Sequence, residues 1–159
     1  MINNDITNLL NKDNSEFSMS QQHDISQVYQ RLKEIASKQR LKIKGTGINT
    51  TALVNEAWIK SKKQSKTFTD RNHFFAYCAL AMRHILLNEA KRNQILTFIE
   101  YDVNEPRNST HKESDYLLDL DLQLKNLKKF DPRLEQVFVY KYFGDMEFVD
   151  IAAMLNVSE

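Results

Sequence analysis

The chain has 159 residues, of which 42% are hydrophobic and 27% charged, and its formal net charge is +1. This length and composition allow one moderate hydrophobic core or two small ones, and they exclude a compositionally disordered chain. Three Gly and two Pro residues, among many helix-forming residues, favour an all-α fold over a sheet-rich one.

The small net charge hides two segments of opposite sign. Residues 24–95 hold fourteen Lys and Arg against five Asp and Glu (+9), whereas residues 96–159 hold seven against thirteen (−6) and residues 1–23 one against three (−2). The basic segment suits a polyanion, because each neutralised phosphate releases counterions. The acidic segment is repelled from DNA unless a local basic helix overcomes its charge.

The N-terminal residues 1–23 are rich in Asn, Ser and Asp and lack a long apolar period. They predict a flexible tail with room for one short helix. No basic and apolar leader is present at this end, and the longest apolar runs fall far short of a membrane span. A cytoplasmic location is therefore expected.

Two helices are predicted next. Apolar residues recur at three- and four-residue steps from Asp24 to Leu41, which indicates the first. Residues 45–47 (Gly-Thr-Gly) then break the chain, and residues 49–51 offer side-chain oxygens that can cap a second helix ending at about Lys63.

A third helix is predicted from Arg71 to Arg92, after a polar loop at residues 61–70. One of its sides is apolar and includes Cys78, which is expected to be a small buried hydrophobe. Another face gathers basic and polar side chains, namely Arg83, His84, Asn88, Lys91 and Arg92, with Tyr77 one to two turns back. Three such helices make a minimal bundle.

The second half of the chain predicts a linker and three more helices. Residues 96–113 contain Pro106 and four acidic residues without a sustained period, which indicates an acidic linker between two small domains. Leucines at positions 117–127 mark a fourth helix. A capping Asp131 followed by Pro132 starts a fifth, which ends near Gly144, and residues 146–155 form the sixth.

Residues 147–159 have the pattern of the first helix and turn of a helix-turn-helix. Asn156 is suited to the left-handed backbone of the turn, and Ser158 is placed to cap a following helix. The sequence stops where that DNA-reading helix is expected, so we predict an incomplete helix-turn-helix with a frayed end. Apolar residues are expected to be partly uncovered there, namely Val137, Phe138, Ile151, Leu155 and Val157.

Nothing in the sequence indicates an enzyme. It has no Gly-rich phosphate loop, no paired His at metal-ligand spacing and only scattered carboxylates in its basic half. A small nucleic-acid hydrolase is therefore disfavoured. No catalytic residue, metal or cofactor is expected, since the four His residues at positions 23, 73, 84 and 111 are also scattered.

Three stretches occur in an informative order. They are TTALVNEAW at residues 50–58, residues 71–86 from RNHFFA to AMRHIL, and residues 131–144 from DPR to YFG. Together they resemble the extracytoplasmic-function (ECF) subfamily of sigma-70-type RNA polymerase sigma factors, over about residues 24–159. The resemblance implies a region-two-like helical domain at 24–95 and a region-four-like helix-turn-helix domain at 114–159, truncated before its recognition helix.

The resemblance also implies a function and partners. An ECF sigma factor binds core RNA polymerase, directs promoter recognition and opens promoter DNA at the minus-ten element; it is not itself an enzyme. The second helix would meet the coiled coil of the polymerase β′ subunit through Leu53, Asn55, Glu56, Trp58 and Ile59. Leu53 and Trp58 are first of all core residues. Residues 116–143 would pack on the β flap, and an anti-sigma factor is a possible further partner.

By the same resemblance, the loop at residues 62–70 and the next helix would capture a flipped base of the non-template strand. The candidates are Phe68, Asp70, Arg71, Asn72 and His73, with Tyr77 either stacking on a base or packing in the core. Arg83, His84, Asn88, Lys91 and Arg92 would follow the phosphates, unless they form a merely solvated face. The alternatives are a sigma-like adaptor that only binds polymerase, and a stand-alone helix-turn-helix regulator.

Overall fold

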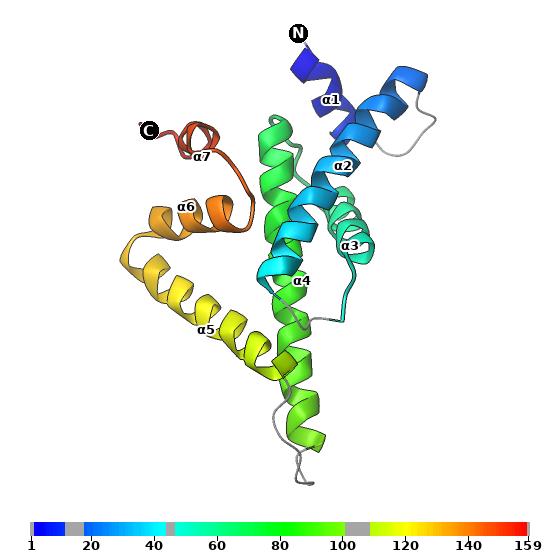
Figure 1. The fold of residues 1–159 in the computed structure, drawn as a ribbon. Helices are drawn as coiled ribbons and strands as arrows, with labels where there is room; N and C mark the ends of the chain where they lie inside the picture. Colours follow the sequence, from blue (N-terminus) through cyan, green and yellow to red (C-terminus); the bar gives the residue numbers. More distant parts are fainter. Residues whose placement is uncertain (1, 12–17, 44–46, 101–108, 159) are drawn as a thin grey trace.

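The computed structural model describes residues 2–11, 18–43, 47–100 and 109–158, and these ranges form seven helices without a strand (Figure 1). The predicted all-α class is confirmed. The helices are α1 (Ile2–Asn11), α2 (Met19–Lys42), α3 (Thr50–Lys63), α4 (Arg71–Glu100), α5 (Ser109–Phe130), α6 (Pro132–Tyr142) and α7 (Phe148–Leu155). No helix in the described ranges is long and apolar enough to cross a bilayer.

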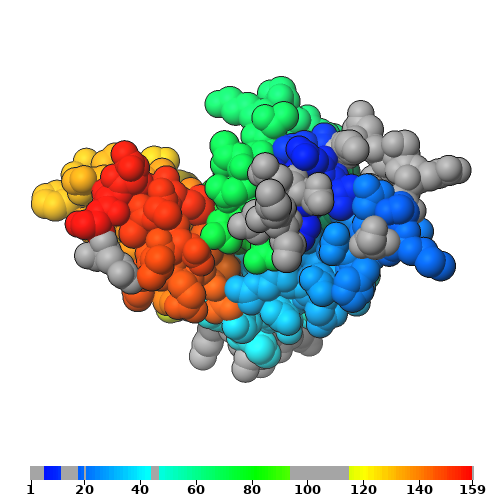
Figure 2. Space-filling model, turned by 90° about the horizontal axis from the view of Figure 1, so that it is seen from above, coloured from blue at the N-terminus to red at the C-terminus, as the bar shows by residue number. Residues whose placement is uncertain are grey.

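The long helix α4 is the centre of the fold. In Figure 1, α2 and α3 lie on one side of α4, and α5, α6 and α7 lie on the other. Figure 2 shows the second half of the chain, in orange and red, beside the green of α4, with its orange part also against the blue of α2. The two halves of the chain therefore meet along α4.

The N-terminal segment contains more structure than the sequence predicts. Helix α1 packs on α2 and α4 and buries Ile6, Leu9 and Leu10. Helix α2 begins at Met19, before the predicted start at Asp24, because Ser18 and Gln21 form a reciprocal capping box that the apolar period does not reveal. A flexible tail over residues 1–23 is thus not what the described part of this segment shows.

The predicted linker is shorter than expected. Helix α4 continues past Arg92 to Glu100, and α5 begins at Ser109. No Gly or Pro occurs from residue 93 to residue 100, so no helix-breaking residue interrupts this extension of α4. Of the predicted linker, only residues 101–108 lie outside the described ranges.

The main hydrophobic cluster crosses the predicted boundary between domains. It joins Leu53 and Phe74 of the first half to Leu117, Val139 and Phe143 of the second. A smaller cluster brings Ala76 of α4 together with Met146 and Ile151. Ile151, predicted to be partly uncovered, is therefore buried, since α4 supplies the surface that covers it. In this structure the two halves share a core.

Local signals set the ends of α6 and α7 as predicted. The Asp131 side chain accepts a hydrogen bond from the backbone N–H of Arg133, with Pro132 in the first turn. Asn156 has a φ of 53°, which confirms its predicted left-handed conformation. Val157, expected to be partly uncovered, is exposed.

The turn between α6 and α7 depends on two residues that the sequence analysis did not single out. A Cβ atom on Gly144 would lie 2.5 Å from the backbone oxygen of Tyr140, so only glycine fits this close approach. The next residue, Asp145, has a φ of 53°, a conformation that Asp and Asn tolerate better than most residues. This turn aims the Asp145 side chain at α2.

Candidate nucleic-acid and polymerase interface

Helix α3 exposes part of the predicted polymerase-binding set. Asn49 caps the helix by accepting a hydrogen bond from Ala52 N at 2.8 Å. Asn55, Glu56 and Ile59 then share one exposed side, and Ile59 keeps 51% of its surface accessible. The Leu53 side chain is fully buried, so it holds α3 in the core and does not reach a partner.

Trp58 is half-buried and packs edge-on against the ring of Phe74, with a centroid separation of 5.8 Å. Lys62 lies over the indole ring, with Nζ 5.3 Å from the ring centroid. Trp58 therefore connects α3 to α4, as its core role in the sequence analysis predicts.

Phe68 organises the loop between α3 and α4. Its side chain is only 4% exposed and packs edge-on against His73, Phe74 and Tyr77. The Asn11 side chain donates to the Phe68 carbonyl at 3.1 Å and accepts from Phe68 N–H at 2.8 Å. The Phe68 ring, a predicted part of the base-capturing pocket, is not accessible to a base in this structure, because the ring is covered by protein.

The start of α4 is capped by candidate DNA contacts. Asp70 accepts a hydrogen bond from His73 N–H at 2.8 Å, and His73 Nδ1 accepts one from Thr69 N–H at 3.2 Å. Arg71 is exposed beside this cap. Asp70 and His73 therefore stabilise the start of α4 in the free chain. Arg71 is the accessible cation among the candidate DNA contacts of this segment.

Tyr77 lies between loop and helix. Its hydroxyl donates to the backbone oxygen of Lys60 at 3.2 Å, while its ring contacts Phe68. Burial, with a smaller contribution from Cys78, raises the pKa of Tyr77 above its usual value, so the hydroxyl remains a donor at neutral pH. The half-buried ring packs against the protein, and stacking on a base stays a prediction.

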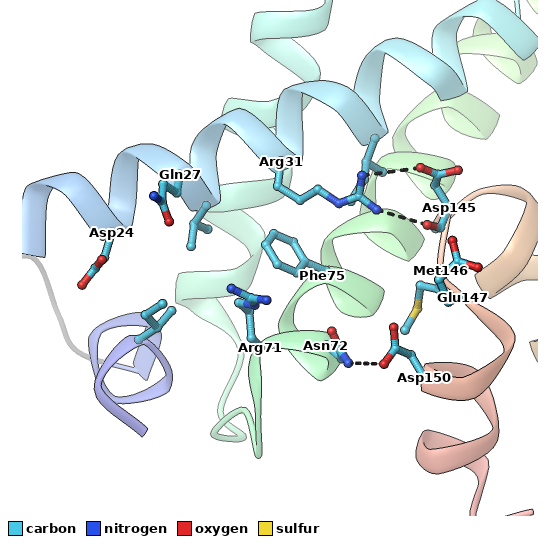
Figure 3. A pocket seen from close by; sticks show the side chains of 14 residues that line it. Asp24, Gln27, Arg31, Arg71, Asn72, Phe75, Asp145, Met146, Glu147 and Asp150 are labelled. Carbon is cyan, nitrogen blue, oxygen red and sulfur yellow. Dashed lines mark hydrogen bonds and ion pairs between the residues drawn. The ribbon is translucent and has the colours of Figure 1, made fainter. Parts of the chain in front are cut away.

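A cavity of about 340 Å³ lies between α2, the start of α4 and the α6–α7 turn (Figure 3). Asn72 donates to the Asp150 carboxylate of α7 at 3.0 Å. Across the cavity, Arg31 donates to the carboxylate of Asp145 at 3.5 Å and to its backbone oxygen at 3.1 Å. Lys38 pairs with the same carboxylate. Acidic side chains of the second half thus meet donors of the first.

These cations lower the pKa of the Asp145 carboxyl. Burial alone would raise its pKa, but the hydrogen bond from Lys38 and the charges of Lys38, Arg31 and Lys42 outweigh burial and hold the pKa below its usual value. Asp145 is therefore ionised at neutral pH and attracts the basic face of α2.

Arg83 differs most from its prediction. It was expected on the phosphate-facing surface, yet only 5% of it is exposed, and its Nη2 lies 2.6 Å from the carboxylate of Asp121 on α5. Lys125 binds the other Asp121 oxygen at 2.8 Å. Burial would raise the pKa of Asp121, but Lys125 and Arg83 together lower it. The reason for the difference is tertiary, because the partner is 38 residues away.

The other predicted phosphate contacts remain accessible. His84, Asn88, Lys91 and Arg92 are exposed, and Arg92 donates to Glu89 at 2.8 Å. Burial, and then the charge of Arg83, lower the pKa of His84, so the imidazole is neutral at pH 7. This exposed face is the largest part of the predicted interface that the structure keeps together.

A groove of about 460 Å³ runs beside this face. Its walls include three lysines that the sequence analysis missed, namely Lys60 of α3 and Lys125 and Lys128 of α5. They come from separate helices, so only the packing of α3 and α5 beside α4 reveals the group. Within the described ranges, no three His, Cys, Asp or Glu side chains gather as metal ligands.

The comparisons with known proteins agree with this architecture. The family model described as ECF sigma factor matches residues 3–159. No curated protein and no solved structure matches the chain. Because the match covers almost the whole sequence, the chain belongs to the ECF sigma factor family and is a DNA-binding sigma factor of transcription initiation. The family is not enzymatic, and it implies RNA polymerase and promoter DNA as partners.

Proposed function

We propose that this chain binds core RNA polymerase through the exposed side of α3 and uses α4 and the preceding loop to hold single-stranded minus-ten promoter DNA. Residues 24–95 act as a region-two-like unit, and residues 114–159 act as a region-four-like unit that docks on the β flap. The polymerase site of residues 24–95 is the β′ coiled coil.

The exposed side of α3 supports the polymerase contact. Asn55, Glu56 and Ile59 combine an amide, a carboxylate and an apolar side chain on one helical surface. A half-exposed Ile between polar neighbours is a suitable apolar anchor for a helical partner. The buried Leu53 fixes the helix on which these residues stand.

The DNA contact is carried by one observation above all. His84, Asn88, Lys91 and Arg92 are exposed on one face of α4, in the segment of the chain with a charge of +9. Such a face matches a phosphate backbone by charge and offers side-chain donors to its oxygens. Arg71, at the start of the same helix, is exposed beside the loop, on a different side of α4.

The test has two steps. The full chain is first titrated with core RNA polymerase, and the complex is then titrated with a fluorescently labelled single-stranded A+T-rich oligonucleotide at several salt concentrations. Glu56→Ala with Ile59→Ala should weaken the first step. Lys91→Ala with Arg92→Ala should weaken only the second and reduce its salt slope by about 0.7 for each phosphate that is no longer neutralised.

A matched control removes two positive charges elsewhere. Lys129→Ala with Arg133→Ala changes exposed residues near the junction of α5 and α6, and it should leave capture of the single strand almost unchanged. Equal losses from both pairs of substitutions would contradict a site on α4. A folded chain that binds DNA but not core polymerase would contradict the polymerase contact and favour a stand-alone regulator.

A further inference from the structure

Helix α1 is joined to the α3–α4 loop by a pair of hydrogen bonds from one side chain. The Asn11 amide donates from Nδ2 to the Phe68 carbonyl at 3.1 Å, and its Oδ1 accepts from Phe68 N–H at 2.8 Å. Both backbone polar groups of Phe68 are thus satisfied by a residue that lies 57 positions earlier in the chain. Figure 1 shows α1 at the end of the bundle where α4 begins, which is also where this loop lies.

A second contact joins the same two segments. Lys62, near the end of α3, donates from Nζ to the Leu10 carbonyl at 2.8 Å. Leu10 is in the last turn of α1, where carbonyl groups lack an intrahelical partner and the helix dipole favours a cation. The apolar side chains of Ile6, Leu9 and Leu10 are buried where α1 packs on α2 and α4. Helix α1 is therefore held in place by the bundle and can support the loop.

The loop depends on this support. Among residues 64–70, all of which the structure describes, Phe68 is the only buried one. Within the described ranges, residues 65–69 make no backbone–backbone hydrogen bond. The rings of Phe74 and Tyr77 hold the Phe68 side chain, whereas the Asn11 amide holds its backbone. Because the backbone sets the direction of the neighbouring residues, the pair of hydrogen bonds from Asn11 orients the exposed residues on both sides of Phe68.

We propose that Asn11 is a positioning residue of the single-strand site, and that its pair of hydrogen bonds to Phe68 fixes the α3–α4 loop in the conformation that captures a flipped base. This inference rests on the proposed function, which gives the loop its contact with the single strand. Asn11 does not touch the base. It acts through the loop backbone, which carries the exposed Lys66 and Thr69 and leads into Arg71. The DNA-binding unit therefore includes α1 in addition to residues 24–95.

A fixed loop favours capture because less order has to be created when the strand binds. A loop without the Asn11 hydrogen bonds samples more backbone conformations, and the entropy lost when it becomes ordered on the DNA subtracts from the affinity. Flipping a base out of its stack is itself costly, so a pocket that is already formed recovers more of that cost.

The test compares Asn11→Ala with Asn8→Ala. Both replace an exposed Asn of α1, and Asn8 makes no hydrogen bond through its side chain in the described residues. Complexes of core RNA polymerase with each variant and with the unmodified chain are titrated with a labelled single-stranded A+T-rich oligonucleotide. They are also titrated with copies in which each base in turn is replaced by an abasic site. The ratio of the two affinities reports base capture, because a general loss of structure lowers both affinities alike.

The unmodified chain and Asn8→Ala should bind the intact strand about tenfold more tightly than the copy that lacks the captured base, as expected for one base held in a pocket. Asn11→Ala should lower this ratio by about threefold, comparable to the cost of ordering one flexible side chain. Its affinity for polymerase should not change. In the free chain, the Phe68 amide should exchange faster in Asn11→Ala and not in Asn8→Ala. Equal ratios for the two variants, or equal losses on intact and abasic strands, would overturn the proposal.

A second variant keeps the size of the side chain. Asn11→Asp can still accept a hydrogen bond from Phe68 N–H, but its carboxylate cannot donate to the Phe68 carbonyl. Its ratio should lie between those of the two Ala variants, since the added negative charge weakens the binding of intact and abasic strands equally. A ratio as high as that of Asn8→Ala would overturn the proposal.

The same titrations separate this inference from the proposed function. If the unmodified chain binds polymerase but does not capture the intact strand, the proposed function fails and the positioning role fails with it. If the unmodified chain captures the strand and discriminates against the abasic copy, whereas Asn11→Ala discriminates equally well, the inference fails alone.

Discussion

The halves of this chain on either side of α4 are stabilised in different ways. Helices α3 and α4 interlock through side chains without solvent contact, such as Leu53, Phe74 and Met82. The second half buries fewer large side chains and leaves Phe130 and Phe148 exposed, at 87% and 55%. The first half thus holds its own core, whereas the second depends on α4 for much of its covering.

The largest expected effect tests the core of the first half. Phe74→Ala should lower the free energy of unfolding by about 3–5 kcal/mol, because a fully buried ring is replaced by a cavity. Phe148→Ala should change it by less than about 0.5 kcal/mol, since that ring is half-exposed. Urea denaturation followed by circular dichroism measures both. Similar losses would mean that the two halves are stabilised alike.

The next effect concerns the buried ion pair between the halves. Asp121→Ala leaves Arg83 without its carboxylate and should cost about 3 kcal/mol. Arg83→Met combined with Asp121→Leu should recover most of that loss, because it removes both buried charges. If the double variant is as unstable as Asp121→Ala in the same denaturation assay, the pair is needed for more than mutual neutralisation.

A smaller loss is expected at the α6–α7 turn. Gly144→Ala places a Cβ atom 2.5 Å from the Tyr140 oxygen and should cost about 2 kcal/mol through local strain. The loss should appear first as faster amide exchange in α6 and α7. Faster exchange in α3 of comparable size would contradict the separation of the two halves.

The smallest effect is an acid-dependent loosening. The pKa values of Asp121 and Asp145 lie below their usual value of 3.8, so their stabilisation is complete above that pH and is lost as the pH falls through the lowered values. Between about pH 4 and pH 2, α5–α7 should lose amide protection before α3 and the first part of α4. Asp145→Asn should show less of this pH dependence, and an unchanged profile would exclude Asp145 as a source.

Local signals in the sequence predicted much of the fold. Asn49, Asp131 and Asn156 mark helix ends through the capping and turn chemistry of their own side chains. The full length of α4 was missed because a polar, acidic composition was interpreted as a linker, although no helix-breaking residue interrupts it before residue 101. The composition indicated the charge of that segment, but it did not indicate that part of the segment is helical.

The candidate site was predicted less completely. The exposed face with His84, Asn88 and Lys91 follows from helical periodicity. The burial of Arg83 does not, since its neighbour Met82 faces the core and its partner Asp121 belongs to another helix. Phe68 was predicted by resemblance to help capture a flipped base, whereas the contacts of Asn11 and Tyr77 with it keep it buried. The sequence pattern does not reveal contacts between residues that lie far apart in the chain.

The most direct measurement is the distance between the two halves in the free chain. Spin labels are placed at Lys66→Cys in the α3–α4 loop and at Ala153→Cys on α7, both exposed. Cys78 is buried and its thiol pKa is raised, so it remains protonated and unlabelled. Pulsed electron paramagnetic resonance should give one narrow, short distance between the two labels, because the second half packs on α4 and shares its core. A long or broad distance in the folded chain would contradict the shared core.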